Sequence, residues 1–145
     1  MSEASDDIEA IKQLKARYFR CMDTKQWDEM REVFADDVHV DMEAEGGGIQ
    51  DSRDEFMRML RQNIEDVVTV HHGHMPEITL TSPTTATGVW AMEDKLWWPD
   101  GAPITHLHGY GHYHETYEKG PDGAWRIKTL TLTRLRKDFV LPDGT

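Results

Sequence analysis

The sequence predicts one α+β domain, with N-terminal helices folded onto a curved antiparallel sheet that the rest of the chain forms. Three observations lead to this fold class. The chain has 145 residues, the size of a single ordinary domain. Up to Asn63 the apolar residues recur at helical spacing, and after Asp66 apolar and polar residues alternate between turn signals. Helices that are segregated from antiparallel strands are typical of the α+β class.

Composition and charge exclude several classes of protein. Apolar residues make up 38% of the chain and charged residues 30%, which is typical of a folded globular protein. The formal net charge of -11 disfavours binding to nucleic acid or anionic lipid, because like charges repel. No apolar run approaches the ~20 residues that span a bilayer, and the acidic N-terminus lacks the apolar segment of a signal peptide. We therefore expect a cytoplasmic protein without nucleic-acid or membrane partners.

A first helix is predicted from about residue 6 to residue 22, after a loose tail at residues 1–5. Ser5 or Asp6 can cap its N-terminus, because their side chains accept hydrogen bonds from unpaired backbone N–H groups. Apolar side chains that recur every three or four residues form one buried face: Ile8, Ile11, Leu14, Tyr18, Cys21 and Met22. Because Cys21 is the only cysteine, no intramolecular disulfide can form. Its place on this face favours a buried small side chain over a nucleophile.

Shorter elements are predicted between residues 23 and 66. A short helix covers about residues 27–34, a short strand follows at about 38–42, and a third helix runs from about 52 to 63. The glycine run 46–48 predicts a loop. This loop does not match a phosphate-binding loop, because the Lys and Ser/Thr that such a loop requires do not follow it.

Four long strands are predicted in the remaining chain, at about residues 67–80, 84–97, 106–117 and 125–137. Short Pro- and Gly-containing connections join them, so neighbouring strands must run antiparallel. Strands of this length twist and curl, and a curled sheet that is closed by helices encloses a pocket. The tail at residues 140–145 is expected to be loose.

Five polar residues fall on faces that are predicted to point inward: Tyr18, Asp23, His71, Asp94 and Arg134. Taken singly, each has a structural explanation. Tyr18 can be a core tyrosine, Asp23 a turn residue and His71 a neutral histidine bonded to backbone. Asp94 and Arg134 can form a structural ion pair, since buried charges are costly unless they are paired or face a cavity. Their combination in one pocket instead favours a catalytic site.

The chemistry of this set fits proton transfer. Asp23 can orient His71 and stabilise its protonated form, which makes the histidine a base that works near neutral pH. Tyr18 can hydrogen-bond a carbonyl oxygen on which negative charge develops. Asp94 can assist the leaving group or a second proton transfer. Arg134 can keep Asp94 ionised or orient the substrate.

An apolar pocket wall is expected from Met75, Trp90, Met92, Trp98 and Tyr110. Adjacent strand residues face opposite sides, so only one of His71 and His72 can enter the pocket, and the spacing favours His71.

A further histidine group comprises His74, His106, His108, His112 and His114. It can line the pocket or a subunit interface. A metal site there is conceivable, but nothing in the sequence fixes a third ligand, so no metal is expected.

Three segments carry a resemblance to a known family. "LKARYFRCMDTKQWDEMREVFADDV", "VHHGHMPEI" and "GHYHETYEKGPDGAWRIKTLTLTRLR" resemble the opening helices, the histidine-bearing strand and the closing hairpin of the SnoaL-like branch of the nuclear-transport-factor-2-like superfamily. The resemblance extends from about Ile8 to Phe139 and implies a cone-shaped α+β barrel, related to the cystatin-like fold.

In function the chain most resembles the bile-acid 7α-dehydratases, with scytalone dehydratases and hexachlorocyclohexane dehydrochlorinases as relatives. The five polar residues look like the catalytic set of the bile-acid enzymes in identity and spacing. The dehydrochlorinases carry a lysine where Tyr18 stands, which favours an oxygen-containing substrate here. The resemblance also implies that no metal or organic cofactor takes part and that the protein is a homotrimer.

The resulting expectation is a cofactor-independent lyase that eliminates water from a hydrophobic cyclic substrate, steroid-like or polyketide-like, with an Asp–His pair as general base. A ketosteroid-isomerase-like enzyme and a dehydrohalogenase need nearly the same residues and stay open. A small-molecule-binding domain without catalysis is the alternative from another class, since one fold hosts many functions.

Overall fold

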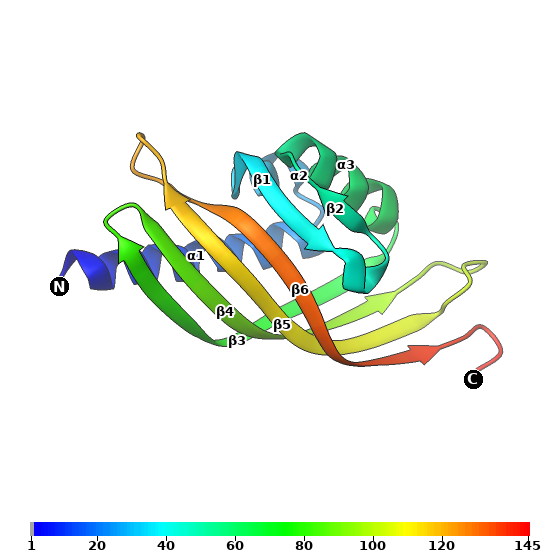
Figure 1. Cartoon of the computed structure of the whole chain (residues 1–145). Helices are drawn as coiled ribbons and strands as arrows, with labels where there is room; N and C mark the ends of the chain where they lie inside the picture. Colours follow the sequence, from blue (N-terminus) through cyan, green and yellow to red (C-terminus); the bar gives the residue numbers. More distant parts are fainter. Residues whose placement is uncertain (1) are drawn as a thin grey trace.

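The computed structural model describes residues 2–145, and in that part of the chain three α-helices lie against one six-stranded sheet (Figure 1). The helical segments are α1 (Glu3–Asp23), α2 (Trp27–Arg31), the short 3-10 turn η1 (Glu43–Glu45) and α3 (Arg53–Ile64). The strands are β1 (Phe34–Met42), β2 (Gly48–Gln50), β3 (Val68–Ser82), β4 (Thr85–Trp97), β5 (His106–Lys119) and β6 (Trp125–Val140). The predicted α+β class is confirmed.

The sheet has the strand order β2-β1-β6-β5-β4-β3. The four long strands β3 to β6 pair antiparallel with their neighbours, as the sequence predicts. β1 runs parallel to β6, and β2 pairs antiparallel with β1 at the sheet edge. β1 begins at Phe34, which sequence reasoning placed in the preceding helix. Phe34 lies four residues after Met30, so its spacing fits a helix as well as a strand.

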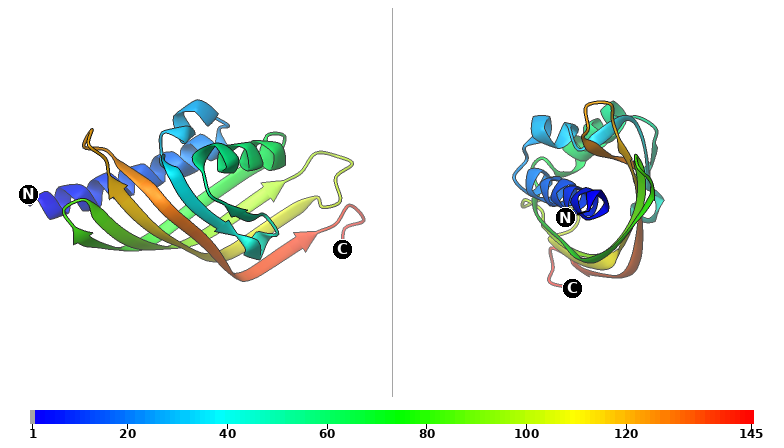
Figure 2. Two further views of the ribbon diagram at one scale, coloured as in Figure 1. Left: turned by 45° about the horizontal axis from the view of Figure 1, so that its top comes forward. Right: turned by 90° about the vertical axis from the view of Figure 1, so that its left-hand side faces the viewer.

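The sheet curls strongly, and the view along the long axis of the molecule shows the strands wrapping around α1 (Figure 2). The main core fills the space between α1 and the concave face of the sheet, with Ile11, Leu14, Phe34 and Leu130 among its fully buried members. This packing places the buried face of α1, including Tyr18, directly against the strands.

Regular secondary structure reaches closer to both chain ends than the sequence predicts. α1 begins at Glu3, and its cap is Ser2, whose Oγ accepts a hydrogen bond from the backbone N–H of Ser5 at 3.2 Å. Residues 3–5, expected to be part of a loose tail, are therefore helical; Met1, the first residue of that tail, lies outside the described residues. At the other end β6 extends to Val140. Within the described part of the chain, no helix combines the length and the apolar character that crossing a membrane would require.

Candidate active site

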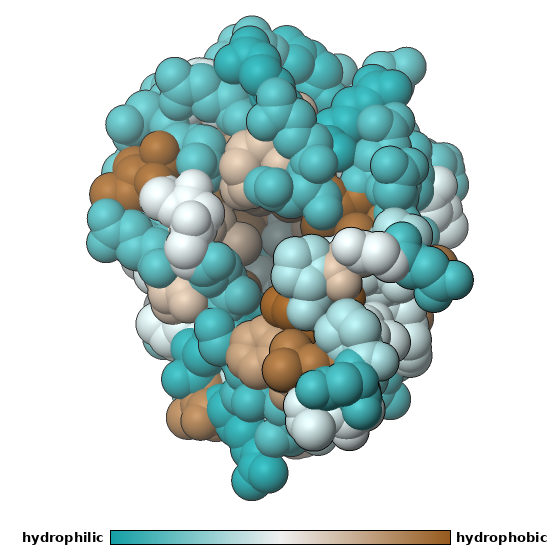
Figure 3. All heavy atoms as spheres, turned by 90° about the vertical axis from the view of Figure 1, so that its right-hand side faces the viewer, coloured by the Kyte–Doolittle hydropathy of each residue, from teal (hydrophilic) through white to brown (hydrophobic). Residues whose placement is uncertain are grey.

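A cavity of about 350 Å³ lies between the helices and the concave face of the sheet. Figure 3 views the end of the molecule beyond α3 and shows the surface hollowed at its centre, with apolar atoms inside a largely hydrophilic rim. A small apolar cluster of Val67, Leu96 and Leu107, with Trp98 packed against it, lines the interior toward this end. The remaining apolar lining comes from α1, β1, α3 and β6: Met22, Met42, Met59, Leu60, Ile64 and Leu132.

His71 and Asp23 form a hydrogen-bonded pair at the cavity wall. Nδ1 of His71 lies 2.7 Å from Oδ1 of Asp23, and the backbone N–H of His71 donates to Oδ2 at 2.8 Å. Because an ionised carboxylate only accepts hydrogen bonds, this contact holds the proton on Nδ1 and leaves Nε2 as the basic atom. His71 lines the cavity, whereas His72 is exposed on the outer side of the sheet. Of the two neighbouring histidines, His71 is therefore the one that can act in the cavity.

Two residues that sequence reasoning missed hold Asp23 in place. Thr69 Oγ1 donates to Oδ1 of Asp23 at 2.9 Å and accepts from Nζ of Lys25 at 3.0 Å. Lys25 has a positive φ of 60° in the turn between α1 and α2. Burial lowers the pKa of Lys25, and the Asp23 carboxylate opposes this shift. A chain of hydrogen bonds therefore fixes the orientation of the imidazole ring; it runs from Lys25 through Thr69 and Asp23 to His71.

Asp94 and Arg134 form a two-bond ion pair inside the cavity. Nη1 of Arg134 donates to Oδ1 of Asp94 at 2.7 Å, and Nη2 donates to Oδ2 at 2.9 Å. Nε of Arg134 donates to Glu45 in η1. Burial lowers the pKa of Arg134, but its hydrogen bonds to Asp94 and Glu45 outweigh burial and raise the pKa above its ordinary value. The guanidinium group is thus permanently charged and is shared between two carboxylates.

The position of the ion pair depends on a glycine and brings Asp94 to the histidine. A Cβ atom at Gly109 would lie 2.5 Å from Oδ1 of Asp94 and closer still to Nη1 of Arg134, so only glycine leaves room for the pair. Oδ2 of Asp94 lies 3.9 Å from Nε2 of His71. His71 therefore has one carboxylate at each ring nitrogen, and the Asp94 side is the one that faces the cavity.

Two phenols, Tyr18 and Tyr113, complete the polar part of the cavity wall. Both are almost fully buried, and their rings meet edge to face with centroids 5.7 Å apart. Burial raises the pKa of Tyr18, and the carboxylate of Glu115 raises it further. Burial likewise raises the pKa of Tyr113. Both hydroxyl groups stay protonated at neutral pH and can donate hydrogen bonds.

All five predicted polar residues thus meet in one place: Tyr18, His71, Asp94 and Arg134 on the cavity lining, and Asp23 directly behind His71. Tyr113 and Glu45 join them without having been predicted. Tyr113 was detectable in principle, because it alternates with Glu115 and Tyr117 on β5. Glu45 lies in the turn before the glycine run, where no periodic pattern assigns a side chain to a face.

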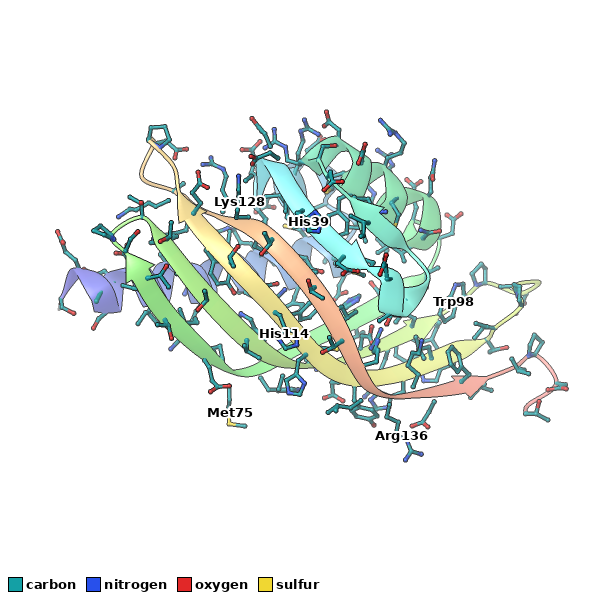
Figure 4. All side chains as sticks on the ribbon, viewed as in Figure 1. His39, Met75, Trp98, His114, Lys128 and Arg136 are labelled. Carbon is teal, nitrogen blue, oxygen red and sulfur yellow. The ribbon has the colours of Figure 1, made fainter. Side chains whose placement is uncertain are left out.

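The predicted apolar wall needs correction. Trp98 lines the cavity, but Trp90 and Met92 point inward into the packed core and are absent from the lining. Met75 is 88% exposed and projects outward from the sheet (Figure 4). A register irregularity between His74 and Glu77 turns this residue away from the cavity.

Tyr110 is also placed wrongly by the sequence pattern. The odd-numbered residues of β5 are the buried ones, so Tyr110 lies on the outer side of the sheet, where its hydroxyl is 3.3 Å from Nδ1 of His108. Gly109 and Gly111 are the inner neighbours of Tyr110, and because they have no side chains, the apolar alternation cannot be read there.

The histidine group belongs to the outer surface as well. His108 and His74 both contact Glu93 through Nε2, at 3.0 and 3.3 Å, and His114 contacts Thr133 (its position is labelled in Figure 4). Among residues 2–145, no group of three or more His, Cys, Asp and Glu side chains is arranged to hold a metal ion. These histidines therefore do not line the cavity.

The chain is similar to a known family of proteins over most of its length. The model of the SnoaL-like domain family matches residues 3–131, which is most of the chain. The chain belongs to the SnoaL-like family. This confirms the resemblance seen in the sequence; the specific likeness to bile-acid 7α-dehydratases stays a prediction.

Individual relatives of this SnoaL-like protein are distant in sequence but similar in fold. A presumed scytalone dehydratase from Novosphingobium aromaticivorans is 22% identical, with a TM-score of 0.84 over 94% of this chain and 89% of the other. A type 2 hexachlorocyclohexane dehydrochlorinase, LinA, is 16% identical, with a TM-score of 0.83 over 97% and 93% of the two chains. "Probable cyclase FGR4" of Gibberella zeae is 22% identical over 93% of this chain and 95% of its own length. At these identities the structural matches establish the shared fold.

Proposed function

We propose that this SnoaL-like protein is a lyase that removes water from a hydrophobic cyclic substrate carrying a hydroxyl group β to a carbonyl. The observation that carries the proposal is the His71–Asp23 pair at the wall of a cavity that combines a large apolar lining with a few fixed polar groups. The names of the relatives support it, since they include a scytalone dehydratase and a dehydrochlorinase, which both denote elimination.

His71 is the proposed general base. Its Nε2 faces the cavity, and Asp23 at Nδ1 supports the positive charge that arises when Nε2 takes a proton from the carbon beside the carbonyl. Asp94 lies 3.9 Å from Nε2, so a second carboxylate stabilises the imidazolium form. The same proton can then pass to the departing hydroxyl group, which leaves as water and returns His71 to its neutral state.

Tyr18 and Tyr113 are the proposed donors to the carbonyl oxygen. Removal of the proton places negative charge on that oxygen, and donors that are already fixed in a water-poor site stabilise this charge. Arg134 is held by Asp94 and Glu45, so its charge is largely neutralised by these partners. We infer that Arg134 orients Asp94, while the tyrosines contact the substrate.

A dehydrohalogenase is the second candidate, because the LinA fold covers 97% of this chain and the base would serve either leaving group. Tyr18 favours the dehydratase. Elimination of halide from a carbon skeleton without a carbonyl produces no oxyanion for a phenol to stabilise, whereas elimination next to a carbonyl does.

The test is a comparison of His71→Ala with His72→Ala in an elimination assay on steroid-like and polyketide-like β-hydroxy ketones. His71→Ala is expected to lower kcat by roughly 10²–10⁴, the usual contribution of a general base. His72→Ala is the matched control, since the neighbouring histidine is exposed on the outer side of the sheet, and it should keep the rate of the unmodified protein.

Analysis of the products in deuterated water separates the candidates. A dehydratase releases water and yields a new double bond, an isomerase shifts an existing one, and a dehydrohalogenase releases halide from a chlorinated analogue. Full turnover by the His71→Ala variant would rule out the proposed mechanism. If the unmodified protein converts none of these substrates, the result would favour a small-molecule-binding domain without catalysis.

A further inference from the structure

A fully buried ion pair lies behind the two tyrosines of the cavity. Nζ of Lys15 on α1 is 2.5 Å from Oε2 of Glu115 on β5, and both side chains are 0% exposed. Neither residue touches the cavity, so the reaction proposed above makes no direct use of them. A pair of this kind needs an explanation, because taking two charges out of water costs more than a similar apolar pair would.

The surroundings of the pair are built to hold it. Oε1 of Glu115 accepts a hydrogen bond from the hydroxyl of Tyr117 at 2.6 Å, and that hydroxyl accepts one from Nε1 of Trp90 at 2.9 Å. Gly88 makes room for this arrangement, since a Cβ atom there would lie 2.6 Å from the Tyr117 hydroxyl. Both oxygens of Glu115 therefore have defined partners, and its carboxylate cannot turn away from Lys15.

The ammonium group of Lys15 lies against the rings of the two cavity tyrosines. Nζ is 3.7 Å from the ring centroid of Tyr18 and 3.6 Å from that of Tyr113. Burial lowers the pKa of Lys15 to about 8, with Glu115 opposing the shift, so the charged form predominates at neutral pH. A cation this close to a ring face is attracted to its electrons, and the attraction is strongest where water is excluded.

We propose that Lys15, held against the two rings by Glu115, is a positioning residue that strengthens Tyr18 and Tyr113 as hydrogen-bond donors to the cavity and outweighs the opposing effect of the Glu115 carboxylate. A phenol that donates to a developing oxyanion gains negative charge in its ring, and the ammonium group against that ring stabilises the gain. The stabilisation is larger in the transition state than in the bound substrate, so it raises kcat more than it lowers KM. The expected change in kcat rests on the proposed elimination reaction. The expected polarisation of the two phenol groups by Lys15 does not depend on that reaction.

The test replaces both charges together, as Lys15→Met with Glu115→Leu. Removal of one partner alone would leave an unpaired buried charge and could unfold the protein, whereas apolar replacement of a buried pair is often neutral or stabilising. The double variant leaves the Tyr117 hydroxyl without its acceptor, so we expect a lower thermal midpoint with the fold and KM retained. We expect kcat to fall on the order of 30-fold, the equivalent of a desolvated cation–π contact. The control is Asp7→Leu with Lys119→Met, a less buried ion pair between the same two elements, which should keep kcat.

A second readout does not depend on turnover. Tyrosine labelled with ¹³C at Cζ reports the polarisation of each phenol by NMR, and the double variant should shift the Tyr18 and Tyr113 signals upfield. Tyr110 lies on the outer side of the sheet and is the internal control whose signal should stay in place. If these two shifts occur but no ketone is turned over, the proposed function fails while the positioning role stands. If the signals of Tyr18 and Tyr113 do not move, or kcat stays within twofold of the unmodified protein, the positioning role is overturned.

Discussion

Asp23 accepts three hydrogen bonds, from the ring and the backbone of His71 and from the hydroxyl of Thr69. Each of them restricts the carboxylate in a different direction, so the ring of His71 can neither rotate nor exchange its protonated nitrogen. A base that must be ready before the substrate arrives benefits from such fixation, because no reorganisation is then needed in the transition state. At the scale of single residues, the contacts behind the base fix the orientation in which it works.

The hydroxyl of Thr69 offers a direct test of this fixation. Thr69→Val keeps the shape of the side chain but removes the donor to Asp23 and the acceptor of Lys25. We expect kcat to fall about 10-fold, the equivalent of one hydrogen bond to a charged group, with little change in KM. Thr69→Ser should restore the rate. The control is Thr116→Val, which breaks a hydroxyl contact to Thr129 away from the cavity; an equal loss in that variant would contradict the role given to Thr69.

At the scale of elements, the four long strands were predictable because their alternation is long and their connections carry turn residues. The inner face of β4 was also assigned correctly: Trp90, Met92 and Asp94 share it. Strand alternation gives the face of a sheet, but it does not say which part of that face a helix covers. Trp90 belongs to the main core together with the buried face of α1, whereas Asp94 and Leu96, farther along the same face of β4, line the cavity.

Two other features of the fold leave no local pattern in the sequence from which they could be predicted. The irregularity that turns Met75 outward needs a positive φ of 31°, which the sequence around this residue does not announce. The parallel pairing of β1 with β6 joins segments about ninety residues apart, and a nine-residue strand fits many partners. The polar set itself was found from the sequence because charged residues on apolar faces are rare enough to stand out.

The end of the turn η1 and the first two glycines after it line one side of the cavity, and Glu45 anchors this segment to Arg134 on β6. Glu45→Gln weakens this anchor, so we expect faster hydrogen exchange of the amides at residues 43–47 and a KM raised about fivefold, as for the loss of ~1 kcal/mol. Glu43→Gln is the control in the same turn, since Glu43 is exposed. Unchanged exchange in the Glu45→Gln variant would show that the ion pair does not hold the turn.

At the scale of the whole molecule, the buried pair of Lys15 and Glu115 links the function of the cavity to the stability of the fold. Burial lowers the pKa of Lys15 to about 8 in the folded state, below the ordinary value of 10.5 that applies when the chain is unfolded. Between these two values the unfolded chain binds more protons than the folded one, so stability increases as the pH rises. The groups that face Lys15 are Glu115, Tyr18 and Tyr113.

We therefore expect the free energy of unfolding to rise by about 2 kcal/mol between pH 7.5 and 9.5, measured by urea denaturation. The upper limit is set by the buried tyrosines: because burial raises the pKa of Tyr18, Tyr113 and Tyr117, they resist ionisation in the fold and oppose stability above about pH 10, where unfolded tyrosine ionises. The double variant Lys15→Met with Glu115→Leu should lose the rise below pH 9.5 and keep the decline above pH 10. A rise of the same size in that variant would mean that other groups cause it and that Lys15 keeps its ordinary pKa. Such a result would leave the tyrosine-positioning role in place, since that role requires only that Lys15 is charged at neutral pH and lies against the two rings.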